Sequence, residues 1–223
     1  MKWNGWQWML GGFLILAASG QAQSIKPNVL KQIQHKQNVI MNELKYGNTH
    51  FSGPTRKNNR PKIMVLMSSG CSASAEQIFH LPANELYVNQ IWGDLVSKVL
   101  LGSLEHGAKV LHIPVLIVIG DRASSAVKAA IREVDNPRPY WRSPNMKAAI
   151  QQLEFPVREV SLGVLKGQTR LEAATQENVQ NVIREILEQS PALWQRRIVG
   201  TLKIEGAIYS NQTGKLTWLP PVP

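Results

Sequence analysis

Two apolar runs in the sequence each lead into side chains that can do chemistry. Residues 63–68 run into a short Ser-Gly segment and then Cys71, which is the single cysteine of the chain. Residues 115–119 run into Asp121 and Arg122. A thiol can act as a nucleophile, as a zinc ligand or as half of a disulfide. A carboxylate beside a guanidinium can bind a metal ion or help to hold an anion.

Both runs are typical of buried parallel strands, because they are short, continuously apolar and followed by glycine. Ligands of open α/β sheets bind beyond the carboxyl ends of such strands. We therefore expect Cys71 to lie at the ligand-binding edge of a sheet. Its simplest interpretation is a buried small apolar side chain. The alternatives are a reactive thiol or a disulfide between chains, since one cysteine cannot form a disulfide within the chain.

The residues after the second run also have two interpretations. Asp121 and Arg122 can form a local ion pair, or Asp121 can cap the start of the next helix. Alternatively, Arg122 forms an anion pocket with Ser124 and Ser125 at the helix N-terminus, suited to bicarbonate or another small anion. Neither serine has an identifiable general base nearby in the sequence, which argues against a hydrolase.

Composition indicates a globular protein, and the N-terminal residues indicate that it is exported. The formal net charge is +10. The basic residues are scattered along the sequence, apart from one compact cluster at Arg56, Lys57, Arg60 and Lys62. No nucleic-acid-binding motif accompanies this cluster, so we expect no nucleic-acid partner. Residues 1–22 read as a signal peptide, with Lys2 before an apolar run at residues 9–18. We predict a periplasmic or extracellular protein, tethered to a membrane only if this leader is retained.

The remaining chain alternates between expected strands and helices, which favours an α/β fold with a mainly parallel sheet flanked by helices. An N-terminal helical arm is predicted over residues 25–46, followed by one domain over residues 47–223. The expected strands are residues 63–68, 86–91, 115–119, 199–208 and 216–219. The expected helices are residues 72–79, 95–110, from 124 onwards, 146–153 and 178–189.

Several motifs, in this order, resemble the β-class carbonic anhydrase family over nearly all of the mature length. They are Gly47-Asn48-x-x-Phe51, Pro61 to Cys71, Ser103-Leu104-Glu105-x-Gly107, Val118-Ile119-Gly120 followed by Ala126 to Ala130, and Glu205 to Tyr209. The resemblance implies a β-carbonic-anhydrase-like fold with an N-terminal helical arm and a C-terminal strand pair. It also implies a homodimer, or a heterodimer with a related protein, in which the arm crosses onto the partner.

The same resemblance indicates that the zinc site has been lost. Family enzymes hold zinc with two cysteines and a histidine, beside an Asp-Arg pair. Cys71 fits the first ligand, but Ala73 and Ala75 replace the Asp-Arg pair, Asp121 replaces the histidine, and Ser124 replaces the second cysteine. Zinc hydration chemistry needs three firm ligands and one open position. We therefore predict no zinc and no catalytic residues.

Two functions follow from this comparison with the family. The first is a non-enzymatic binding, scaffold or regulatory protein, with a small anion as a possible ligand. The alternative is an active carbonic anhydrase with a rearranged zinc site, completed by a histidine such as His80 or His106.

Overall fold

The computed structural model describes residues 26–49, 61–137, 143–161 and 165–223. The expected signal peptide, the motif residue Phe51 and the basic residues Arg56, Lys57 and Arg60 lie outside these ranges. No helix within the described residues is both long and apolar enough to cross a membrane.

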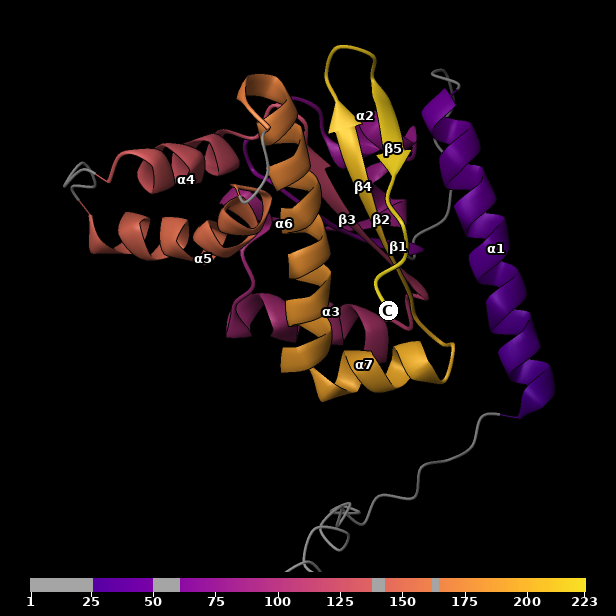
Figure 1. Ribbon diagram of the computed structural model, residues 1–223. Coiled ribbons are helices and arrows are strands. Elements are labelled where there is room, and N and C mark those ends of the chain that lie inside the picture. The colour runs from indigo at the N-terminus through magenta and orange to yellow at the C-terminus, as the bar shows by residue number, and fades with distance from the viewer. Residues whose placement is uncertain (1–25, 50–60, 138–142, 162–164) are drawn as a thin grey trace, which may run out of the picture.

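A five-stranded sheet forms the centre of the molecule, in the order β2-β1-β3-β4-β5 (Figure 1). Its strands are β1 (Ile63–Met67), β2 (Leu86–Gln90), β3 (Val115–Asp121), β4 (Lys203–Ser210) and β5 (Lys215–Trp218). The first four run parallel, and β5 pairs antiparallel with β4. The expected α/β class, the mainly parallel sheet and the C-terminal strand pair are confirmed.

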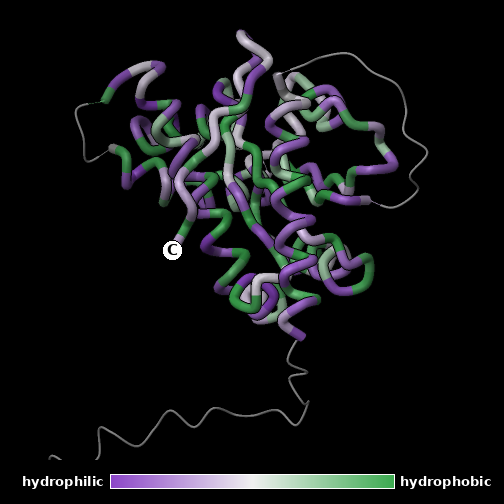
Figure 2. Tube along the Cα trace, turned by 90° about the vertical axis from the view of Figure 1, so that its right-hand side faces the viewer, coloured by the Kyte–Doolittle hydropathy of each residue, from purple (hydrophilic) through white to green (hydrophobic). Residues whose placement is uncertain are grey.

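Side chains of the central strands alternate between two apolar layers, as the period of two in a strand requires. Met64 and Leu66 of β1 pack with helices α3 (Lys98–Lys109), α6 (Gly167–Gln189) and α7 (Pro191–Ile198). Val65 and Met67 pack on the other face with α1 (Pro27–Thr49) and α2 (Ala75–Phe79). Figure 2 shows apolar stretches along the strands and mixed apolar and polar stretches along the helices around them. The sheet is thus covered by helices on both faces.

Helices α4 (Ser125–Asp135) and α5 (Pro144–Ser161) project together from one side of the sheet (Figure 1). They form a third apolar cluster, in which Val127 of α4 and Leu153 of α5 pack with Leu171 of α6. Gly120, at the end of β3, allows α6 to approach closely, because a Cβ there would lie 2.7 Å from Val179 Cγ2. This packing fixes the point at which the chain leaves β3 and enters α4.

Four helices differ from the sequence expectation. Helix α1 continues through Gly47 to Thr49, α5 is longer than residues 146–153 although it contains Pro156, and α6 begins at Gly167 rather than near residue 178. Helix α7 was missed, and residues 199–202 are not part of a strand. The sequence signal for the start of α7 was Ser190-Pro191. Ser190 caps the helix by accepting a hydrogen bond from Leu193 N, and proline suits the first helical position.

The second half of the arm packs against its own domain, and the expectation that the arm crosses onto a partner stays a prediction. Ile40, Met41 and Leu44 are buried in the layer that contains Ile63 of β1. The buried Gln37 side chain donates from Nε2 to the carbonyls of Pro114 and Gly200, each at 3.2 Å. One face of α1 is therefore satisfied within the subunit.

Candidate functional site

The carboxyl edge of the sheet brings Cys71 and Asp121 into one neighbourhood. After β1, the buried Ser68 hydroxyl accepts hydrogen bonds from Gly70 N at 3.4 Å and from Gly93 N at 3.3 Å. These bonds tie the turn before Cys71 to the segment after β2. Burial raises the pKa of the Cys71 thiol, and the nearby Asp121 and Asp94 raise it further, although the Ala73 and Ser72 N–H groups oppose the shift. Cys71 is therefore half-buried and protonated rather than a ready thiolate.

Asp121 and Ser124 organise the start of α4. The buried Asp121 carboxylate accepts a hydrogen bond from Ala123 N at 2.8 Å, and the Asp121 carbonyl accepts one from Ser124 N at 2.9 Å. The Ser124 hydroxyl then caps the helix by accepting from Val127 N at 3.2 Å. The helix-start interpretation is confirmed for Ser124, which satisfies a backbone donor that the helix N-terminus leaves open. Asp121 instead holds the turn that precedes the helix.

Arg122 does not pair with its neighbour Asp121, so that part of the sequence interpretation was wrong. Its guanidinium donates from Nε and from Nη2 to Glu172 Oε1 of α6, both at 2.8 Å. The Ser125 hydroxyl accepts from Trp92 Nε1 at 3.1 Å. The three residues of the expected anion pocket, Arg122, Ser124 and Ser125, are therefore each engaged by another part of the protein.

The ion pair between Arg122 and Glu172 has a small expected effect on stability. The hydrogen bond from Arg122 is the largest cause that lowers the pKa of Glu172. The pair therefore stabilises the fold above the pKa of Glu172 in the unfolded chain, and this stabilisation is lost as the pH falls through the lower folded pKa. Arg122→Gln should reduce the free energy of unfolding by at most about 1 kcal/mol at neutral pH, because both side chains are partly exposed.

Urea unfolding at neutral and acid pH measures this effect, and Arg158→Gln is the matched control. Arg158 forms a more exposed pair with Glu154, one helical turn away in α5. We expect the Arg122→Gln difference to vanish in acid. A difference that persisted there would mean that Arg122 acts by packing rather than by pairing.

A fourth residue, Asp94, belongs to this site and was missed by sequence reasoning. It ends the short 3-10 turn Trp92–Asp94 after β2 and has a positive φ of 60°. Its side chain is buried, and Oδ1 has no hydrogen-bond partner among the described residues. Burial, followed by the charge of Asp121, raises its pKa well above the ordinary value for aspartate. The sequence could have indicated Asp94 by its position just after an expected parallel strand, because residues that follow such strands lie at the carboxyl edge of the sheet.

An open pocket of about 490 Å³ lies beside Cys71. Ser72 and Ala73 line it next to Gln77 of α2, Tyr209 at the end of β4 is part of its wall, and Lys215 of β5 supplies a positive charge. Burial raises the pKa of the Tyr209 hydroxyl, and so do nearby Cys71 and Asp121. The pocket is therefore a polar cavity walled by a protonated phenol and one lysine.

The residues of this edge do not fit zinc. Within the described ranges, no three His, Cys, Asp or Glu side chains are grouped to hold a metal ion. Ala75 is fully buried among apolar side chains, so no charged group replaces the expected arginine. His106 lies in the last turn of α3, and His112 precedes the start of β3, which places both at the edge of the sheet opposite Cys71. One thiol, a carboxylate that already accepts from Ala123 N and a hydroxyl that caps α4 are a poor donor set for zinc.

Comparison with known proteins identifies the family. Residues 63–216 match the family model described as "Carbonic anhydrase". Carbonic anhydrase 2 of Mycobacterium tuberculosis is 25% identical over 159 residues, which cover 70% of this chain and 73% of that protein. The chain therefore belongs to the carbonic anhydrase family.

Solved structures place its fold in the β class. A structure of tetrameric β-carbonic anhydrases from Sordaria macrospora has a TM-score of 0.63 and 15% identity, covering 87% of this chain and 98% of that chain. The β-carbonic anhydrase from Coccomyxa has a TM-score of 0.61 and 20% identity, covering 86% and 85% of the two chains. The expected membership of the β-carbonic anhydrase family is confirmed.

Proposed function

We propose that this chain is an exported β-carbonic-anhydrase-like binding or regulatory protein that neither holds zinc nor hydrates CO2. The proposal rests on what Asp121 and Ser124, at the positions of two zinc ligands in the family, do in this structure. Asp121 accepts from Ala123 N and Ser124 caps α4. Both side chains therefore serve the backbone at the place where a hydration catalyst would need firm metal ligands.

The pocket beside Cys71 is the proposed binding site for a small polar solute. Lys215 and the hydroxyl of Tyr209 suit a small anion such as bicarbonate. Arg122 is held by Glu172, so this assignment moves the anion from the helix N-terminus to the pocket between α2 and the β4–β5 hairpin. Tyr209 adds a hydroxyl that stays protonated and can donate a hydrogen bond.

Self-association is the second part of the proposal, as a homodimer or as a heterodimer with a related active protein. The Sordaria relatives are described as tetrameric, and they share the fold of this chain. Ile40, Met41 and Leu44 of α1 are buried within the subunit, so a contact between copies through α1 would use its exposed side chains, such as Val29 and Val39.

The test is zinc per chain by elemental analysis of protein purified without added metal, followed by a CO2 hydration assay. We expect a zinc content near zero and no hydration above the uncatalysed rate, both unchanged in Cys71→Ser. Carbonic anhydrase 2 of Mycobacterium tuberculosis is the positive control for the assay. One zinc per chain that disappears in Cys71→Ser, together with hydration, would establish the alternative function, an active carbonic anhydrase with a rearranged site.

A further inference from the structure

Exposed apolar side chains gather at the end of the molecule where the parallel strands begin. They are Val110, Leu111, Trp194 and Ile198, each exposed by between 40% and 61%. Trp194 and Ile198 are four residues apart in α7 and therefore share one face of the helix. The α3 and α7 ends are joined by a hydrogen bond from Arg196 Nη2 to the Ala108 carbonyl at 2.7 Å. This bond places Val110 and Leu111 at the same end as Ile198.

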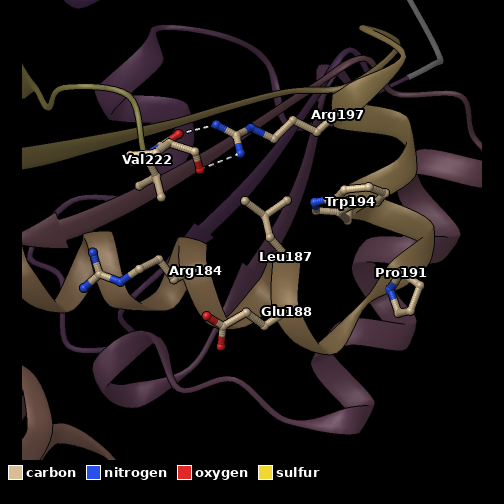
Figure 3. A pocket seen from close by; sticks show the side chains of 8 residues that line it. Arg184, Leu187, Glu188, Pro191, Trp194, Arg197 and Val222 are labelled. Atoms are coloured by element: carbon tan, nitrogen blue, oxygen red, sulfur yellow. Dashed lines mark hydrogen bonds between the residues drawn. The ribbon is translucent and has the colours of Figure 1, made fainter. Parts of the chain in front are cut away.

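The apolar surface continues from Trp194 into a groove of about 670 Å³ between α6, α7 and the C-terminal segment (Figure 3). Leu187, Pro191 and Val222 line this groove beside Trp194. Arg197 donates to the carbonyls of Val222 and Pro223, which holds the C-terminal segment along its edge. The apolar end surface is thus supported by a fixed scaffold rather than by isolated side chains.

Positive charge borders this surface. Lys109 is exposed immediately before Val110, and Lys31 is exposed in the first turns of α1. The loop after α7 contacts those turns, since a Cβ on Gly200 would lie 3.1 Å from Gln34 Nε2 and 3.4 Å from Leu30 Cδ1. Glu188 is the acidic residue of the groove, and Glu105 is occupied by the Ser190 hydroxyl at 2.6 Å. Together with the net charge of +10, this arrangement favours an anionic partner.

The first turn of α1 lies at this same end of the molecule. Helix α1 begins at Pro27 near the level of α7 (Figure 1). The sequence before it contains the apolar run at residues 9–18 and three tryptophans, Trp3, Trp6 and Trp8. Tryptophan combines an apolar ring with a polar N–H and is enriched at membrane–water interfaces.

We propose that the end of the molecule formed by Val110, Leu111, Trp194 and Ile198 is a membrane-docking surface for an anionic bilayer. The apolar side chains enter the interface while Lys31 and Lys109 contact the headgroups, which is the combination that peripheral proteins use. The carboxyl edge of the sheet, with Cys71 and its pocket, then faces away from the lipid. This surface is separate from the proposed solute site.

Vesicle flotation of the full chain tests the proposal. The lipid concentration that binds half of the protein is measured with phosphatidylcholine vesicles, with and without about 30% phosphatidylglycerol. Trp194→Ser combined with Ile198→Ser should raise that concentration about tenfold, because two apolar anchors are lost. Lys109→Glu should raise it about fivefold on anionic vesicles and leave zwitterionic vesicles unaffected.

The matched control is Val99→Ser combined with Phe155→Ser, which removes two exposed apolar side chains from other surfaces, in α3 and α5. All variants are tested both with residues 1–22 and without them, so that the affinity of the leader for lipid is separated from that of the docking surface. Unchanged binding of the Trp194→Ser and Ile198→Ser variant would overturn the proposal. A change in its mass by light scattering, with unchanged flotation, would also overturn it and would assign the surface to contact between copies.

Discussion

Leu44→Ala is expected to lower the free energy of unfolding by about 2–5 kcal/mol, the range observed for buried leucines. Leu44 is fully buried in α1, where it packs in the layer between the arm and the sheet. Removing its side chain loses apolar burial and leaves a cavity that neighbouring side chains fill only in part. Urea unfolding measures the loss, and Val39→Ala, an exposed position on the same helix, should change stability by only a few tenths of a kcal/mol.

The same variant tests where the arm docks. If the apolar face of α1 is buried within its own subunit, Leu44→Ala lowers stability without changing the mass measured by light scattering. If that face instead holds a partner, Leu44→Ala converts the oligomer to monomer at low protein concentration. The second result would contradict the packing of α1 and support the crossing arm inferred from the family resemblance.

Asp94→Asn is expected to stabilise the protein by roughly 1–3 kcal/mol at neutral pH, because the unfolded chain no longer gains free energy by releasing the proton that the buried Asp94 keeps. The substitution removes a buried ionisable group whose Oδ1 lacks a partner among the described residues. Asparagine keeps the shape of the side chain and also tolerates the positive φ of this position. A gain of this size would raise the melting temperature by several degrees, and thermal unfolding would detect it.

The pH dependence of this gain follows from the direction of the pKa shift. Burial raises the pKa of Asp94 in the folded protein, so the folded state keeps a proton that the unfolded chain releases. Stability therefore falls as the pH rises from the unfolded pKa, about 3.9, through the folded pKa. The difference between Asp94→Asn and the unmodified protein should be near zero in acid below that value and should grow with pH.

Asp135→Asn is the control for removing one carboxylate. Asp135 is on the surface and pairs with Arg170, so its replacement should cost at most about 1 kcal/mol. Destabilisation by Asp94→Asn at neutral pH would contradict the expectation. It would show that the ionised Asp94 carboxylate has a partner, such as a cation held with Asp121.

The sequence by itself determined the family and the sheet. The strands β1 and β3 are continuous apolar runs, and burial on both faces of a parallel sheet requires that pattern. Ser124 could be assigned to a helix start because capping depends on residues only three positions apart. These features are local, so their physical causes can be read along the chain.

The tertiary structure decided which side chains meet at the carboxyl edge. Arg122 pairs with Glu172, fifty residues later in the chain, rather than with its neighbour Asp121. Asp94 becomes part of the site because Ser68 holds the turn after β2 against the end of β1. Periodicity and short motifs carry no information on such pairings, which depend on how distant segments pack. The packing of α1 on its own domain is of the same kind, because an apolar helix face indicates burial without indicating which surface covers it.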